Sequence, residues 1–248
     1  MLRNLLLRHI AALGRSAFFL HHRPYDFSSS FRLHSVRYLD IYQLASKAAI
    51  EKERARLVDE MNRGYFADLK ELKEHGGKIS IANKTLVPKV AAMKFPELEV
   101  HLLDGTKLNL PSSKASLQCL YFRGCAQQMI ESWTVPFLDM FHDSRRIEIY
   151  EVSFIDSWYL LAPPIKHLLL KMMKKPVKNE DHVLERKVAC AFGDHYYFRK
   201  ELKILNLLTG YVFLVDKAGK IRWQAFGMSS EAELSSLQSC TSALLEEK

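Results

Sequence analysis

The spacing of apolar residues predicts a long helix in the first third of the chain. From Asp40 to His75, apolar side chains recur at alternating steps of three and four residues, and the remaining faces are heavily charged. Gly76-Gly77 then supplies the residue with positive φ that ends a helix. We assign residues 38–77 to this amphipathic charged helix. An uninterrupted coiled coil is the alternative, and Gly64 argues against it.

Beyond residue 96 the pattern changes to alternating strands and helices. Strand patterns cover 98–103, 106–110, 115–122, 147–154, 210–215 and 221–226, helical patterns cover 125–141, 164–175 and 231–245, and 185–207 is mixed and partly helical. The turns Asp104-Gly105 and Lys217–Lys220 each close a hairpin. This order predicts an α/β fold, a thioredoxin-like mixed sheet with flanking helices, formed by residues 78–248.

The amino-terminal segment has a different composition from the rest of the chain. Residues 1–37 carry six arginines and one acidic residue, a net charge of +5 out of +8 for the whole chain. Leucines at helical spacing, many serines and few acids are typical of a mitochondrial presequence. We therefore expect residues 1–37 to be a cleavable, disordered presequence, with an ordinary amphipathic first helix as the alternative. The nearly balanced charge of residues 38–248 disfavours binding to nucleic acid.

The cysteines do not form a dithiol site. Cys119, Cys125, Cys190 and Cys240 show no CxxC spacing, although a Cys119–Cys125 disulfide is a possible alternative to four free thiols. In a thioredoxin-like fold the redox cysteines follow the strand 115–122, where this chain has Cys125 alone. The proline expected before the strand at Tyr211 is also missing. The remaining redox hypothesis is a one-cysteine peroxidase with Cys125 as its attacking thiolate, near Arg123.

Other chemistry has less support. His182, Cys190 and His195 are spaced by eight and five residues, which matches no compact zinc pattern. The usual motifs of nucleotide binding, zinc proteases and serine hydrolases are absent from the sequence. We therefore predict no cofactor, no metal and no catalytic residue.

Two segments are candidates for contact with a partner. In the expected helix 164–175, Lys171, Lys174 and Lys175 oppose an apolar face and could meet anionic lipid or a membrane protein; the alternative is lysines in water. In the terminal hairpin, Trp223 is expected in the core and Arg222 on the outer face. Arg222 would there pair with a partner's carboxylate, or alternatively form an internal salt bridge.

The same hairpin carries a family resemblance. Its residues run Leu205-Asn206-Leu207-Leu208-Thr209-Gly210-Tyr211-Val212-Phe213-Leu214-Val215-Asp216, then Gly219-Lys220-Ile221-Arg222-Trp223 and Gly227, before an acidic helix start at Glu231 to Glu233. This segment resembles the carboxy-terminal signature of the mitochondrial ATP synthase assembly factors of the "ATPase ten" family. The resemblance spans about Asp40 to Leu245 and is strongest over 205–237.

The resemblance implies a function as well as a fold. It implies a protein without enzymatic activity on the matrix side of the mitochondrial inner membrane, needed to build the Fo sector. Its partners would be the proton-channel subunit a, escorted until it joins the ring of subunit c, and the membrane surface, bound peripherally. The alternative is a mitochondrial thiol peroxidase or redox protein that uses Cys125.

Overall fold

The structure, a computed structural model, describes one helix and one α/β domain. The described residues are 47–75, 77–156, 165, 168, 170, 171, 184 and 186–247. The expected presequence, residues 1–37, and the first part of the expected helix, residues 38–46, lie outside them. Helix α3 spans Lys47–His75, and Gly77 just beyond it has a φ of +80°. The chain divides into two units, residues 1–54 and 55–248, so the proposed boundary at residue 77 stays a prediction.

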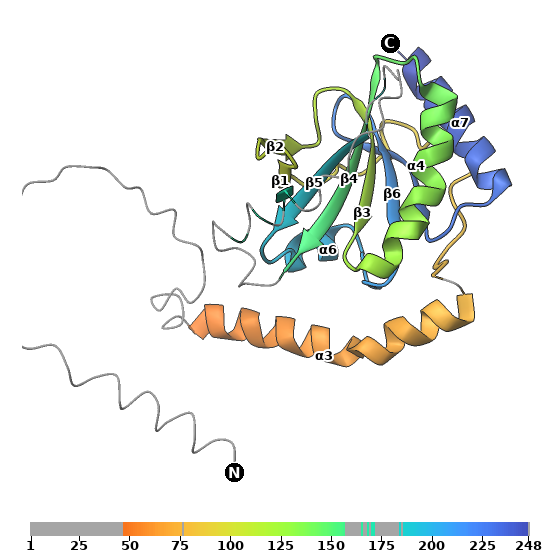
Figure 1. The fold of residues 1–248 in the computed structure, drawn as a ribbon. Helices are drawn as coiled ribbons and strands as arrows, with labels where there is room; N and C mark the ends of the chain where they lie inside the picture. Colours follow the sequence, from red (N-terminus) through yellow and green to blue (C-terminus); the bar gives the residue numbers. More distant parts are fainter. Residues whose placement is uncertain are drawn as a thin grey trace, which may run out of the picture. The chain divides into compact units, whose positions relative to one another are not determined.

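A seven-stranded mixed sheet forms the centre of the larger unit (Figure 1). Its order is β2-β1-β5-β4-β3-β6-β7, with bounds β1 Leu98–Leu102, β2 Lys107–Leu110, β3 Ala115–Tyr121, β4 Ile147–Ile155, β5 Arg186–Phe192, β6 Tyr211–Val215 and β7 Ile221–Phe226. Strands β5, β4 and β3 are parallel, and the other neighbouring pairs are antiparallel. The predicted thioredoxin-like α/β fold is confirmed.

The central strands are apolar because both faces of the sheet are covered. Every residue of β3 and β6 is buried, and β6 is a continuous apolar run of the kind found where both faces of a strand are covered. Helices α4 (Gln127–Phe141) and α7 (Glu231–Glu246) lie on one face of the sheet (Figure 1). On this face the edge-to-face pair Trp133 and Trp223 fills the core. The opposite face packs around Phe95, Phe198 and Phe213, with Phe198 supplied by the short helix α6 (Tyr196–Glu201).

One strand was missed in the sequence. The segment 185–207 was expected to be mixed and partly helical, but Arg186–Phe192 forms β5 between β4 and β1. The strand begins with two charged residues and then places alanines and a cysteine at its buried positions, so it shows neither alternation nor a run of strongly β-forming side chains. Its pairing with β4 and β1, rather than its own sequence preference, makes it a strand.

An extended segment covers the outer edge of β7. Asn83 and Val87 donate backbone hydrogen bonds to Gln224 and Arg222 of that strand, and Ile221 donates to Met93. Trp223 Nε1 also donates to the carbonyl oxygen of Asn83 at 2.6 Å. This cover satisfies backbone groups that an exposed edge strand would offer to other chains.

The helices of the described part of the chain are all too short or too polar to cross a lipid bilayer.

The tryptophan pair should dominate the stability of the domain. Trp223→Ala removes a fully buried side chain from the core and is expected to cost about 3–5 kcal/mol in the free energy of unfolding. Denaturant unfolding followed by circular dichroism measures this loss. Tyr197→Ala, at a half-exposed ring, is the control and should cost less than about 1 kcal/mol. Equal losses for the two variants would contradict the assignment of Trp223 to the core.

Candidate functional site

Cys125 lies where a thioredoxin-like enzyme would place its reactive thiol. It is exposed, in the short 3-10 turn Gly124–Ala126 between β3 and α4, and its Sγ is 3.8 Å from the carbonyl oxygen of Leu208. All four cysteines are among the described residues, and all four are free thiols. Cys119 belongs to the core on one face of the sheet and Phe122 to the core on the other face. Cys125 therefore has no second thiol with which to form a disulfide.

The loop before β6 is occupied by contacts from α3. Leu207 donates its backbone N–H to Asp68 Oδ2 at 3.0 Å, and the buried Asn206 donates to the Asp68 carbonyl oxygen at 3.2 Å and to Glu71 at 2.9 Å. Tyr211 holds the loop from the other side, because its hydroxyl donates to the Asn206 carbonyl oxygen and accepts from the Asn206 N–H. Asn206 and Tyr211 therefore join α3 to the sheet.

A second junction forms around Gly227, at the end of β7. Its carbonyl oxygen accepts a 2.7 Å hydrogen bond from Trp133 Nε1, and its N–H donates to Gly210 at 2.9 Å. Its φ is +67°, and a Cβ atom here would lie 2.6 Å from the Gly77 carbonyl oxygen. Glycine is required by the backbone conformation and by the close approach of the chain.

Arg222 is buried, so the expectation that it faces a partner is wrong and the alternative, an internal salt bridge, is correct. Both terminal nitrogens of its guanidinium donate to Glu247 at 2.7 Å, and its Nε donates to the Val87 carbonyl oxygen at 2.5 Å. Asp216 lies 3.5 Å away, and the side chain is only 2% exposed. Arg222 is buried because two segments distant in sequence, the one at Val87 and the carboxy-terminal end of α7, pack over its side chain.

The ion pair between Arg222 and Glu247 shifts the pKa of both groups toward their charged forms. The hydrogen bonds and charge of Arg222, and then those of Lys89, lower the pKa of Glu247 to about 2. The hydrogen bonds that Arg222 donates to Glu247 in turn raise the pKa of its own guanidinium. Asp216 also accepts backbone hydrogen bonds from Ala218 and Lys220, which shapes the turn between β6 and β7.

The lysines expected to meet a partner are only partly described. Lys171 is helical and exposed and Leu170 beside it is buried, whereas the apolar Ile165 and Leu168 of the same segment are exposed. Lys174 and Lys175 lie outside the described residues. A role in partner binding for these lysines stays a prediction.

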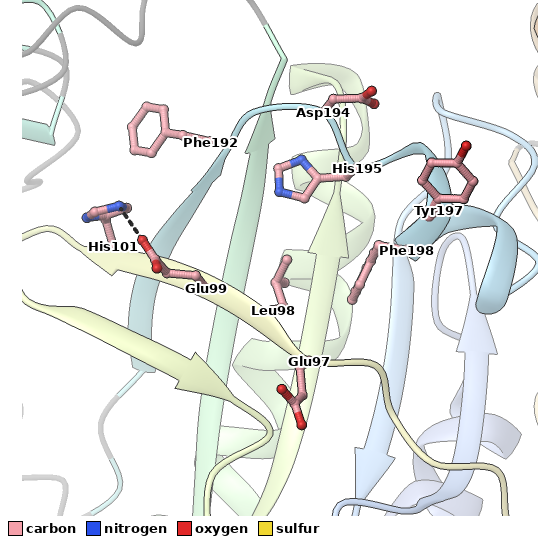
Figure 2. A pocket seen from close by; sticks show the side chains of 9 residues that line it. All are labelled: Glu97, Leu98, Glu99, His101, Phe192, Asp194, His195, Tyr197 and Phe198. Carbon is pink, nitrogen blue, oxygen red and sulfur yellow. Dashed lines mark ion pairs between the residues drawn. The ribbon is translucent and has the colours of Figure 1, made fainter. Parts of the chain in front are cut away.

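A pocket of about 330 Å³ lies between β1 and the segment that joins β5 to α6 (Figure 2). Its lining residues are Glu97, Leu98, Glu99, His101, Phe192, Asp194, His195, Tyr197 and Phe198. Burial lowers the pKa of His195, whose ring meets Phe154 edge to face. Sequence reasoning missed this pocket because two segments about ninety residues apart build it. Among the described residues no group of side chains is arranged to hold a metal ion, and His182 lies outside them.

Comparison with known proteins identifies the family. The sequence profile of the ATP10 protein family matches residues 28–244. The chain belongs to the ATP10 family.

Two curated relatives show the extent of the similarity. The mitochondrial ATPase complex subunit ATP10 of Saccharomyces cerevisiae is 25% identical over 206 residues, covering 73% of this chain and 70% of the relative. The protein of the same name from Eremothecium gossypii is 22% identical over 232 residues, covering 86% and 80%. The family resemblance stated from the terminal hairpin is thereby confirmed.

Solved structures also show similarity. A Sco-family cytochrome c oxidase assembly protein, BsSco, is 12% identical with a TM-score of 0.45, covering 63% of this chain and 96% of that chain. The thioredoxin domain of a thiol-disulfide oxidoreductase from Bacteroides vulgatus is 15% identical with a TM-score of 0.39, covering 60% and 95%.

The signature residues of this ATP10 family chain have structural roles. Asn206 and Tyr211 attach α3, Asp216 shapes a turn, Arg222 pairs with Glu247, and Trp223 fills the core. Gly227 completes the junction with Gly77 and Trp133. These residues of the terminal hairpin therefore stabilise the fold.

The Gly227 junction gives a test with a matched control. Gly227→Ala would place a Cβ against backbone and force a positive φ, so we expect a loss of at least about 2 kcal/mol in the free energy of unfolding. Gly124→Ala meets open space and should change it by less than about 0.5 kcal/mol. Chemical denaturation of the two variants provides the comparison. A neutral Gly227→Ala variant would disprove the close approach.

The Arg222 cluster predicts a pH dependence of stability. Folding lowers the pKa of Glu247 from its ordinary 4.5 to about 2, so the native state favours the charged carboxylate. The contribution of the Arg222–Glu247 pair to the free energy of unfolding is therefore fully present above pH 4.5 and is lost as the pH falls toward 2. Glu247→Gln should lose less stability than the unchanged protein over this interval, as measured by melting temperature. Glu97→Gln, at an exposed carboxylate, should behave like the unchanged protein.

Proposed function

We propose that this protein is a non-enzymatic assembly factor for the Fo sector of mitochondrial ATP synthase. It binds the proton-channel subunit a on the matrix side of the inner membrane before subunit a joins the ring of subunit c. The observation that carries the proposal is the family match over residues 28–244, together with relatives described as mitochondrial ATPase complex subunits.

The region around Cys125 supports a role in binding rather than redox catalysis. Cys125 has no second thiol, and on the facing loop the Leu207 N–H and the Asn206 side-chain nitrogen donate hydrogen bonds to α3. A dithiol enzyme needs two cysteines at this position and an accessible loop opposite them. A thioredoxin-like fold without these features can still serve as a scaffold, since function depends on the site and not on the fold.

Partner contact is proposed for the basic helix and not for Arg222. Lys171 is exposed, and Lys174 and Lys175 follow it on the same sequence pattern. Cationic side chains on an amphipathic helix suit a membrane-embedded partner or the anionic lipid around it.

Isolation of the tagged protein from mitochondria during translation of subunit a tests the proposal directly. We expect newly made subunit a to be recovered with it, and mitochondria without the protein to lack assembled Fo sector on native gels. Lys171→Glu combined with Lys174→Glu should reduce the recovery of subunit a. Normal Fo assembly in the absence of the protein would refute the proposed function.

The redox alternative rests on the exposed Cys125 near the start of α4 and has its own test. A peroxidase loses all activity with its attacking thiolate, whereas a scaffold loses almost nothing at an exposed position. We therefore expect Cys125→Ser to restore Fo assembly to cells that lack the protein, at an unchanged protein level. Failure of this variant at a normal protein level would favour the redox protein.

A further inference from the structure

The loop 88–95 and the turn 216–220 form one projecting tip at the β7 edge of the sheet. Phe95 donates its N–H to the Gly219 carbonyl oxygen at 2.8 Å, and Lys94 and Lys220 form an isolated antiparallel bridge. Lys220 Nζ donates to the Lys89 carbonyl oxygen at 2.8 Å. The fully buried Phe95 anchors the loop in the core. We call this surface the basic tip.

The basic tip carries an excess of positive charge. Its four lysines are Lys89, Lys94, Lys217 and Lys220. Glu247 pairs with Lys89 at 3.3 Å and Glu97 with Lys94 at 3.8 Å, and Asp216 is used by the buried Arg222 and by turn backbone. With Arg222 included, five cationic side chains meet three carboxylates, those of Glu247, Glu97 and Asp216, which leaves two positive charges in excess.

Apolar side chains project from the same tip. Val90 is 98% exposed, the highest value among the exposed large apolar residues described, and Met93 is 43% exposed. Ala91 and Ala92 both donate to the Pro88 carbonyl oxygen, so Val90 lies in a hydrogen-bonded turn. The side chain of Val90 is thus exposed to water among lysines, which is unfavourable in free energy for an apolar group.

We propose that the basic tip binds the surface of an anionic lipid bilayer, with Val90 and Met93 inserted among the headgroups. Lysines attract anionic headgroups, and neighbouring apolar side chains enter the boundary between headgroups and acyl chains. A bilayer offers both kinds of contact at one surface, anionic headgroups for the lysines and an apolar boundary for Val90. The proposal deepens the proposed function and rests on it for the identity of the membrane, while the binding itself can be measured on the purified protein.

A probe at the tip tests insertion separately from any binding by the amino-terminal arginines. The full chain carries Cys125→Ser and Val90→Cys, labelled with the polarity-sensitive dye NBD, and Val135→Cys on α4 is the matched exposed control. We expect a blue shift and a rise of emission at position 90 with vesicles of phosphatidylcholine and phosphatidylglycerol. Vesicles of phosphatidylcholine alone should give neither change, and position 135 should not respond. An unchanged signal at position 90 overturns the proposal.

Charge reversal provides an independent measurement. Lys94→Glu with Lys217→Glu should weaken binding to the anionic vesicles at least about 25-fold, because each lysine near such a surface contributes about fivefold. Lys70→Glu with Lys73→Glu makes the same change in net charge on α3 and should weaken binding less than about twofold. Equal losses of vesicle affinity in the two double variants would show a general charge effect and would overturn the proposal. Binding of the protein to a polyglutamate peptide without binding to vesicles would indicate an acidic protein partner and would also overturn it. Loss of vesicle binding with normal Fo assembly would instead refute the membrane role within the proposed function.

Discussion

The close approach of Gly77 and Gly227 is the constraint on which the arrangement of the domain depends. At this point the chain leaving α3 passes within van der Waals distance of the end of β7, and no residue with a Cβ fits there. The same glycine accepts a hydrogen bond from Trp133, which in turn packs edge to face on Trp223. Helix α3, helix α4 and the terminal hairpin therefore meet at one backbone position. A side chain at position 227 would separate all three.

The family signature is explained by this meeting of elements. A sequence motif is often taken for a binding site, but here its polar members face inward and join distant segments. Asn206 holds α3, Asp216 shapes a turn, and Arg222 holds the end of α7 through Glu247. Buried polar groups must have partners, so substitution at one of them leaves the other without a hydrogen bond. In this chain the polar residues of the motif stabilise the folded hairpin and its neighbours.

We propose that contacts with a partner use surfaces that the motif does not include. The lone Cys125 and the occupied loop before β6 leave the usual redox position of this fold without its machinery. The exposed Lys171 and the basic tip around Val90 lie outside the buried signature residues and differ from them in chemistry, since both combine lysine with apolar side chains. This division between a structural motif and functional surfaces is compatible with a scaffold that works beside a membrane.

The sequence by itself determined every element whose apolar pattern was strong, including the hairpin at Asp104-Gly105, the buried strands β3, β4 and β6, and helices α4 and α7. It also determined the α/β class, the family and the core position of Trp223. Only the tertiary structure decided that Arg186–Phe192 is a strand, because its partners β4 and β1 supply the preference that its own residues lack. The same holds for Arg222, whose partners Val87 and Glu247 lie 135 and 25 residues away. Alternation assigns a side chain to a face of the sheet, but what covers that face depends on segments that only the folded chain brings there.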